Sequence, residues 1–383
     1  MSELVRQEIM SMADLVVVKV GTRVLTDSDG MLDKSRIDSI AGQIAQLWQA
    51  GKKCVVVSSG AVGAGLGRLG LKQRPTDLAQ LQAAAAIGQS VLIESYNRSL
   101  EQHELHAAQM LLTAEDLKDR TRYLNVRNTL FALFESNAVP IINENDTVSV
   151  EELKLSFGDN DRLAALVTNL IRAPLLVLLS DIDGVYSGDP KDSASQVLSV
   201  ITDVTAAQAQ LVRDDPHRPG MRLSTGGMTS KMTAARIATS AGENVVIANG
   251  RHDNVLLDIM AGRDVGTLFL AEGPAVDSRK RWIGWSASPN GKLLLDAGAC
   301  RALASGGRSL LAVGVAKVEG NFVKGDVVSL CDEAGEEFAR GLSNYPADEM
   351  RLIARQPSER IAELLGHRPY YEVVHRNNLI VLG

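Results

Sequence analysis

LVVVKVGT, residues 15–22, is an apolar run rich in valine that stops at Gly21. A short run of β-branched residues before a glycine predicts a buried strand that ends in a loop. Apolar residues then recur at helical spacing until Gly51, which can cap the end of a helix. A second apolar run, residues 54–57, leads into a segment rich in glycine. Strand, helix and strand in this order are the unit from which parallel sheets are built.

The same alternation continues to about residue 270. It predicts an α/β fold, a three-layer α-β-α sandwich whose mostly parallel sheet carries helices on both faces. Ligands of such sheets bind beyond the carboxyl ends of the strands, where the polar segments of this chain are found. The further strands are predicted at 105–112, 139–142, 175–179 and 245–248, and the further helices from about Thr76 and at 121–135, 162–171 and 229–241.

The pattern of the sequence changes after residue 270. A polar stretch that contains Pro274 predicts a linker over 271–287. Beyond it, short apolar runs alternate with Gly and Asn turns, which is typical of a small, mainly β domain. We therefore predict a catalytic domain over 1–270 and a second domain over 288–383. In the second domain, strands are predicted at 310–318, 327–330 and 372–374, and a helix at about 348–354.

Composition excludes several classes of protein. The chain has 383 residues and a formal net charge of -6, which gives no support to nucleic-acid binding as its main role. Its three cysteines are far apart and form no CxxC or Cys/His cluster, so neither a disulfide framework nor a zinc site is predicted. The first residues lack the pattern of a signal peptide, and no apolar run approaches membrane-spanning length. We expect a cytoplasmic enzyme with no membrane contact.

Two segments after the first strands combine glycine with groups that suit an anion. Lys19 lies at the end of the first strand, beside a loop whose N–H groups can approach an anion, although a lysine before a turn is the alternative. SSGAVGAG, residues 58–65, joins the second strand to a helix, and its small residues allow a ligand to come close. A tight strand-to-helix turn explains that spacing equally well.

Three polar clusters follow later strands. NEND, residues 143–146, would be expensive to bury without partners, which favours ligand binding. FGDND, residues 157–161, offers more polar groups than one helix cap needs, which leaves room for a substrate or a magnesium shell. SDIDGVY, residues 180–186, lies at the same edge of the sheet, although a surface hairpin is the alternative.

TGGMTSK, residues 225–231, leads into a predicted helix. A lysine in the first turn is unfavourable to the helix dipole, and an anion between the lysine and the helix N-terminus would reverse that cost. This segment therefore indicates phosphate binding. None of the six histidines has metal-ligand spacing with acidic partners, so no protein-held metal is predicted.

Taken in order, these motifs resemble the amino acid kinase family. SDIDGVYSGDP, residues 180–190, is similar to a stretch found across the family, and TGGMTSK resembles the branch that acts on amino-acid carboxylates. INENDTV and FGDNDRLAA, with KVGTRVLT and VSSGAVGAG, resemble the members that phosphorylate the side-chain carboxylate of L-glutamate. The resemblance covers essentially the whole chain. The second domain resembles the PUA domain, a small and mainly β pseudo-barrel.

The resemblance implies ATP-dependent phosphorylation of L-glutamate to L-glutamyl 5-phosphate, the first step of proline synthesis, with proline as an inhibitor. Mg²⁺ would bridge the phosphate oxygens of ATP rather than sit in a protein cage. The residues implied are Lys19, Gly21, Gly60, Asp161 and Lys231 for catalysis; Ser59, Asn145, Asp146, Asp159 and Asn160 for glutamate; and Lys19, Ser180, Asp181, Thr225, Gly226, Gly227, Met228, Thr229, Ser230 and Lys231 for ATP.

The resemblance also implies self-association as a dimer or tetramer and functional coupling to glutamyl-phosphate reductase. The nearest alternatives are sibling kinases that act on N-acetylglutamate or aspartate, against which INENDTV and FGDNDR argue. RNA binding by the PUA-like domain is a second alternative. Residues 281–383 hold twelve Lys or Arg and twelve Asp or Glu, so this domain lacks the basic stripe expected for phosphate contacts.

Overall fold

The computed structural model describes residues 2–71, 73–148, 159–190, 192, 194–207, 227–273, 277–305 and 307–382. The chain divides into two compact units, which are described separately. The first comprises Met1–Asp116 and Leu124–Ala275, and the second comprises Leu117–Tyr123 and Val276–Gly383. We keep 1–270 and 288–383 as the proposed limits of the two domains.

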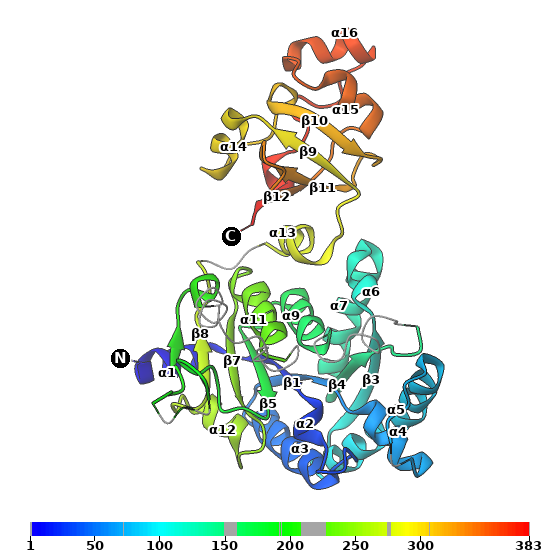
Figure 1. The fold of residues 1–383 in the computed structure, drawn as a ribbon, viewed down its shortest axis with the longest axis vertical. Coiled ribbons are helices and arrows are strands. Elements are labelled where there is room, and N and C mark those ends of the chain that lie inside the picture. The colour runs from blue at the N-terminus through cyan, green and yellow to red at the C-terminus, as the bar shows by residue number, and fades with distance from the viewer. Residues whose placement is uncertain are drawn as a thin grey trace. The chain divides into compact units, whose positions relative to one another are not determined.

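The first unit is built on a sheet that has eight strands in the described residues. These strands are β1 (Leu15–Val20), β2 (Lys53–Ser58), β3 (His106–Leu112), β4 (Ala138–Glu144), β5 (Leu175–Ser180), β6 (Val200–Ile201), β7 (Asn244–Asn249) and β8 (Thr267–Phe269). Their order is β3-β4-β2-β1-β5-β7-β8-β6. Figure 1 labels β3, β4, β1, β5, β7 and β8 across this sheet. Among these described strands, only β7 and β8 are antiparallel neighbours. The predicted α/β fold with a mostly parallel sheet is confirmed.

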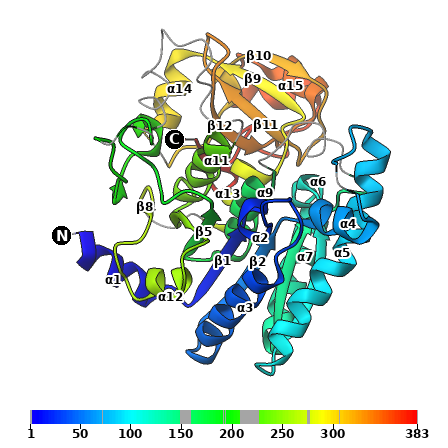
Figure 2. The same ribbon diagram turned by 60° about the horizontal axis from the view of Figure 1, so that its bottom comes forward.

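Helices cover both faces of this sheet. Up to residue 275 the described helices are α1 (Ser2–Met12), α2 (Thr22–Leu25), α3 (Lys34–Gln49), α4 (Ala61–Leu69), α5 (Leu78–Glu101), α6 (Ala114–Lys118), α7 (Arg120–Glu135), α9 (Asp159–Ile171), α11 (Gly227–Thr239) and α12 (Val255–Met260). α9 and α11 pack together on one face, and α3 and α12 lie on the other (Figure 1). Figure 2 shows α3 beside α5.

Strand β1 lies at the centre of the sheet and is apolar on both faces, since Val16–Val18 are fully buried. It pairs with β2 on one side and with β5 on the other. The chain runs from β1 to β2 and returns to β5 only later, so the strand order reverses at β1. A crevice for ligands opens at the carboxyl ends of the strands at such a point. The strand ends are level there, because Lys19 pairs with both Val57 and Leu178.

Helices α4 and α5 touch backbone to backbone at two glycines. A Cβ atom on Gly65 would lie 1.8 Å from the carbonyl oxygen of Ala84. A Cβ atom on Gly88 would lie 1.7 Å from the carbonyl oxygen of Ala61. Neither backbone oxygen can give way without moving its helix. This contact places the start of α4, which follows β2, against the middle of α5.

Gly88→Ala is expected to lower the free energy of unfolding by about 3 kcal/mol, because the new methyl group forces the two helices apart. Gly67→Ala is the matched control on α4, where a Cβ atom would lie 3.5 Å from the Met31 side chain. Alanine there should stabilise the protein by about 0.5–1 kcal/mol, since glycine inside a helix is unfavourable. Urea unfolding of both variants tests this, and equal effects would contradict the close contact.

The second unit contains a five-stranded sheet in the order β10-β9-β11-β12-β13. Its elements are α13 (Ser278–Arg281), β9 (Gly291–Leu295), α14 (Ala297–Ala304), β10 (Val315–Gly320), β11 (Val327–Cys331), β12 (Glu337–Leu342), α15 (Ala347–Ile353), α16 (Ile361–Leu365) and β13 (Leu379–Val381). All neighbours are antiparallel except β9 and β11. A small and mainly β second domain is thus confirmed.

Two strands predicted in this unit are shorter than expected. The strand predicted at 310–318 begins only at Val315, because residues 312–314 form a 3-10 turn. The segment 372–374 forms a single bridge between Val374 and Leu310. Apolar residues in both places reflect burial in the core, which Val374 and Leu310 enter without extended pairing. In the proposed linker, residues 278–286 are helical.

Candidate active site

The polar segments predicted to bind ligands meet at the carboxyl edge of the first sheet. Lys19 lies in β1, Ser59 follows β2 directly, and Asn143 lies near the end of β4. Helix α9 begins with Asp159, whose side chain lies outside the described atoms, and α11 begins with Gly227 in the described residues. Thr225 and Gly226, two residues predicted to hold ATP, lie outside the described part of the chain.

Three charged side chains form a buried cluster at the centre of this edge. The Lys19 Nζ atom lies 2.5 Å from Asp161 Oδ1, and the Lys231 Nζ atom lies 3.3 Å from Asp161 Oδ2. The side chain of Asp161 is only 2% exposed, and those of the two lysines are 8% and 9% exposed. Asp161 therefore lies between the two lysines and contacts the ammonium group of each.

The cluster carries one more positive charge than negative. Burial alone would raise the pKa of Asp161, but Lys19 and Lys231 together hold it below its usual range. Burial lowers the pKa of Lys231, and Lys19 adds to this effect while Asp161 opposes it. A buried charge is stable only when it is paired. The surplus positive charge of this cluster therefore makes it a suitable place for an anion.

The N-terminus of α11 adds further positive potential next to the cluster. The Lys231 side chain turns back along the helix, and its Nζ atom donates to the Gly227 carbonyl at 3.2 Å. Free N–H groups in the first turn and the helix dipole favour a phosphate there. Ser230, which is predicted to hold ATP, donates its hydroxyl to Asp161 Oδ2 at 2.6 Å. Met228 and Thr229 lie in the same turn.

The two predicted catalytic glycines differ in what they offer. The Gly21 N–H donates to the Leu179 carbonyl at 3.0 Å, so it is engaged within the protein. A Cβ atom on Gly21 would lie 3.6 Å from Lys19 Nζ, and glycine therefore keeps the space beside that ammonium open. Gly60 has a φ of 103°, which favours glycine, and it starts α4. Its N–H has no hydrogen-bond partner among the described residues and remains available as a donor.

A group of buried amides lies on the β2 and β4 side of the lysines. The Asn160 Nδ2 atom donates to Ser59 Oγ at 3.1 Å and to Asn143 Oδ1 at 3.0 Å. The Asn160 Oδ1 atom is buried and has no hydrogen-bond partner among the residues described in the structure. Buried polar atoms are normally satisfied, so this oxygen indicates a donor supplied by a ligand.

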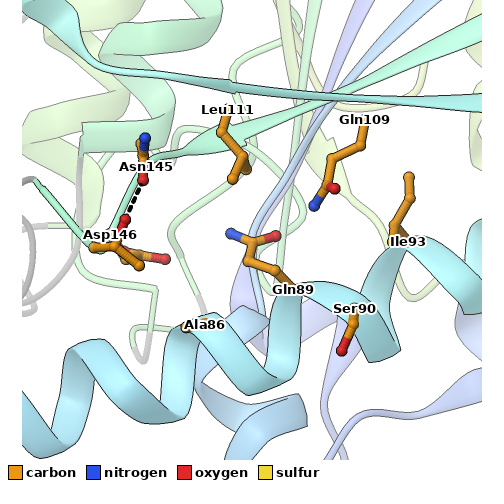
Figure 3. Close-up of a pocket in the computed structure, with 9 residues that line it drawn as sticks. Ala86, Gln89, Ser90, Ile93, Gln109, Leu111, Asn145 and Asp146 are labelled. Atoms are coloured by element: carbon orange, nitrogen blue, oxygen red, sulfur yellow. Dashed lines mark hydrogen bonds between the residues drawn. The ribbon is translucent and has the colours of Figure 1, made fainter.

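Asn145 and Asp146 lie beside this group, at the edge of a cavity of about 330 Å³. The cavity is also lined by side chains of α5 and β3 (Figure 3). Asp146 is 7% exposed, and burial raises the pKa of its carboxyl group to about 6. An ammonium group would stabilise the ionised form of this carboxyl group. Asp146 is therefore suited to bind the cationic end of an amino acid.

The β5 side of the lysines carries the residues predicted for the nucleotide. Ser180 Oγ donates to Asp181 Oδ1 at 3.2 Å, directly after the strand ends. The Arg23 guanidinium contacts Asp181 Oδ2 at 2.9 Å and so joins the segments that follow β1 and β5. Burial opposes ionisation of Asp181, but Arg23 holds its pKa below the usual range.

Two residues of this edge, Arg23 and Gln89, were not predicted from the sequence, and Asn143 was predicted only as part of the NEND cluster. Asn143 stands inside the recognised polar cluster, and Arg23 has no local signal because its partner lies 158 positions away. Gln89 offered a usable signal, since it is a polar residue on the buried stripe of α5.

The described residues lack two further features, a metal-binding cluster and a membrane-spanning helix. The described residues contain no group of three or more His, Cys, Asp or Glu side chains that could hold a metal ion. In the same part of the chain, no helix combines the length and the apolar character that crossing a membrane requires.

Comparison with known proteins agrees with this geometry. The amino acid kinase family matches residues 14–249, and the PUA domain matches residues 291–365. The glutamate 5-kinase of Rhodopirellula baltica is 49% identical over 377 residues, which cover 98% of this chain and 96% of that protein. The glutamate 5-kinase of Moorella thermoacetica is 44% identical over 375 residues, which cover 98% of each chain.

The match over 14–249, together with the mostly parallel sheet, defines a kinase of the amino acid kinase family, to which this chain belongs. Within that family it belongs to the glutamate 5-kinases, because the similarity to them extends over nearly its full length. Its second unit contains a PUA domain.

Proposed function

We propose that this chain transfers the terminal phosphoryl group of ATP to the side-chain carboxylate of L-glutamate, giving ADP and L-glutamyl 5-phosphate. The observation that carries the proposal is the buried Lys19–Asp161–Lys231 cluster with its surplus positive charge. The acceptor carboxylate has an ordinary pKa of about 4.3 and is ionised at neutral pH. The reaction therefore needs positioning and positive charge rather than a general base. The names of the relatives support glutamate as the acceptor.

The two substrates would approach the lysines from opposite sides. Ser59, Asn160 and Asp146 lie on the β2 and β4 side and would hold glutamate, with Asp146 and the free Asn160 oxygen accepting from its ammonium group. Ser180, Asp181 and the start of α11 lie on the β5 side and would hold ATP. The transferred phosphoryl group would then pass between Lys19 and Lys231, and the N–H of Gly60 would donate to it.

ATP would be used together with Mg²⁺. The only carboxylate of the central cluster, Asp161, already contacts two lysines, and the described residues provide no acidic cage. The donors present, two ammonium groups and a helix N-terminus, fit phosphate oxygens. We therefore propose that phosphate oxygens and water hold the metal ion, which when bound neutralises charge on the triphosphate.

An ATP- and magnesium-dependent hydroxamate assay tests the reaction, because hydroxylamine traps acyl phosphates. L-Glutamate, N-acetylglutamate and L-aspartate should be compared side by side, and the expected result is hydroxamate with L-glutamate alone. Hydroxamate formed from another acid would leave the proposed phosphate site standing but would contradict the assignment of L-glutamate as the substrate. No signal from folded protein that binds ATP would overturn the reaction itself.

Four further features belong to the same proposal. Proline would inhibit the enzyme as the end product of the pathway, and titration of the activity with proline tests this. The chain would self-associate as a dimer or tetramer, act in the cytoplasm, and couple functionally to glutamyl-phosphate reductase.

The equal numbers of acidic and basic residues over 281–383 favour a structural or regulatory role for the PUA domain over RNA binding.

A further inference from the structure

A glutamine lies on the buried face of α5, where its neighbours are small or apolar. Gln89 is 8% exposed and shares its stripe with Leu81, Ala85 and Leu92. Its amide cannot be explained by packing, because an apolar side chain would fill the same space without the need for partners. Buried amides are kept where they have hydrogen-bond partners.

The partners of Gln89 lie at the end of β4. Its Nε2 atom donates to the Glu144 carbonyl at 3.5 Å, which is a long and weak contact. The side chain of Asp146 lines the same cavity as Gln89, and the amide acts to lower the pKa of that carboxyl group. Figure 3 shows the nitrogen of Gln89 on the side of the amide that faces Asp146, across one end of the 330 Å³ cavity.

We propose that Gln89, whose amide faces Asp146 across one end of the cavity, is a positioning residue for glutamate that orients the Asp146 carboxyl group towards the α-ammonium group of the substrate. This inference rests on the proposed function, in which Asp146 binds glutamate. L-Glutamate has one cationic group, so a buried carboxylate in its site has one suitable partner. A protonated carboxyl group cannot form that ion pair, and the residue that favours its ionised form therefore controls the affinity for glutamate.

The surroundings of Asp146 give Gln89 this role. Burial raises the pKa of Asp146 to about 6, whereas Gln89 and then Arg74 act to lower it. Arg74 is exposed, so solvent screens its charge, whereas the amide of Gln89 is buried. Among the described residues, Glu144 at the end of β4, two positions before Asp146, also carries a carboxyl group. The side chains that line the cavity from α5 and β3, such as Ser90 and Gln109, are neutral.

The sign of the pH dependence follows from these groups. Above pH 6 the Asp146 carboxyl group is ionised and can pair with the ammonium group. As the pH falls through about 6, the carboxyl group of the free enzyme is protonated, so KM for glutamate should rise while KM for ATP stays constant. Loss of the Gln89 amide, which lowers the pKa of Asp146, would move this rise in KM to higher pH.

The experiment measures KM for glutamate, KM for ATP and kcat between pH 5.5 and 8.5. Gln89→Met keeps the length of the side chain and removes the amide. It should raise KM for glutamate about tenfold at pH 7, the scale of a hydrogen bond to a charged group. The difference from the parent protein should shrink towards pH 8.5, where Asp146 is ionised again. KM for ATP should change less than about twofold.

Gln109→Met is the matched control, because Gln109 lines the same cavity from β3 and does not act on Asp146. This variant should leave the pH dependence of KM for glutamate unchanged. Gln89→Glu keeps the shape of the residue and places a second carboxyl group beside Asp146, which should shift the profile furthest. Thermal melting of each variant checks that it is folded.

The outcomes separate this inference from the proposed function. A parent protein that phosphorylates glutamate, with variants at Gln89 whose profiles match the parent, would overturn the role of Gln89 alone. A loss of affinity that is equal at every pH would show a packing role and would also overturn it. A folded parent protein without activity towards glutamate would overturn the proposed function and the role of Gln89 with it.

Discussion

Replacing Lys231 by alanine is expected to lower kcat by about two to four orders of magnitude, the scale of a preorganised charge that acts on the transition state. Its Nζ atom lies at the N-terminus of α11, 3.3 Å from Asp161 Oδ2 in the buried cluster. The protein should remain folded, because Lys19 still pairs with Asp161 at 2.5 Å and the buried cluster becomes neutral. Initial rates with saturating ATP and glutamate measure the effect.

Arg236→Ala is the matched control for that variant. Arg236 lies in the last turn of the same helix and is exposed, so its loss removes a positive charge far from the cluster. Its kcat should stay within about twofold of the parent value, since exposed charges away from the site act weakly. A normal kcat for Lys231→Ala would remove this lysine from the mechanism.

Asp161→Ala should be the most destabilising single change at the site. Its loss leaves the ammonium groups of Lys19 and Lys231 buried together without a counter-charge. Removal of one partner from a buried ion pair costs about 3–5 kcal/mol, and here two like charges are left. Activity should be lost as well, because the lysines are no longer held in place. Urea unfolding measures the change in stability. Lys231→Ala is the comparison, because it leaves Lys19 and Asp161 as a buried pair with no net charge.

The dependence of folding stability on pH gives a second test of this prediction. The folded protein lowers the pKa of Asp161, so its contribution to stability is present above about pH 4, the ordinary pKa of aspartate, and is lost as the pH falls further. The variant should therefore differ from the parent at pH 7 and differ less in acid. Asp253→Ala, which removes an exposed carboxylate, should change stability by less than about 0.5 kcal/mol. Similar losses for both variants would contradict the role of Asp161.

Much of the fold could be predicted because its signals are local. The strands at 15–20, 54–57 and 175–179 are short apolar runs that stop at small or polar residues, and β1, β2 and β5 lie at these places. The turns at 312–314 were missed because burial, rather than strand pairing, explains the apolar residues around them. An apolar pattern indicates that residues are buried more directly than it indicates their secondary structure.

The N-terminal helix illustrates what local signals leave out. Arg6 of α1 is fully buried and donates to the carbonyl oxygens of Ser199, Val265 and Gly266. Burial lowers the pKa of this guanidinium, and Asp264 opposes the effect. The partners of Arg6 lie 193 to 260 positions away, so no neighbouring residue reveals that this arginine is inside the protein.

The sequence by itself determined which residue types follow which strands, because strand period, turn residues and helix caps act over a few positions. It therefore placed Lys19, Asp161 and Lys231 at strand ends and helix starts. Only the tertiary structure decided that these three meet, since that depends on the order of strands in the sheet. The same long-range packing turned Gln89 towards Asp146, because the rotation of α5 is fixed by its close contact with α4.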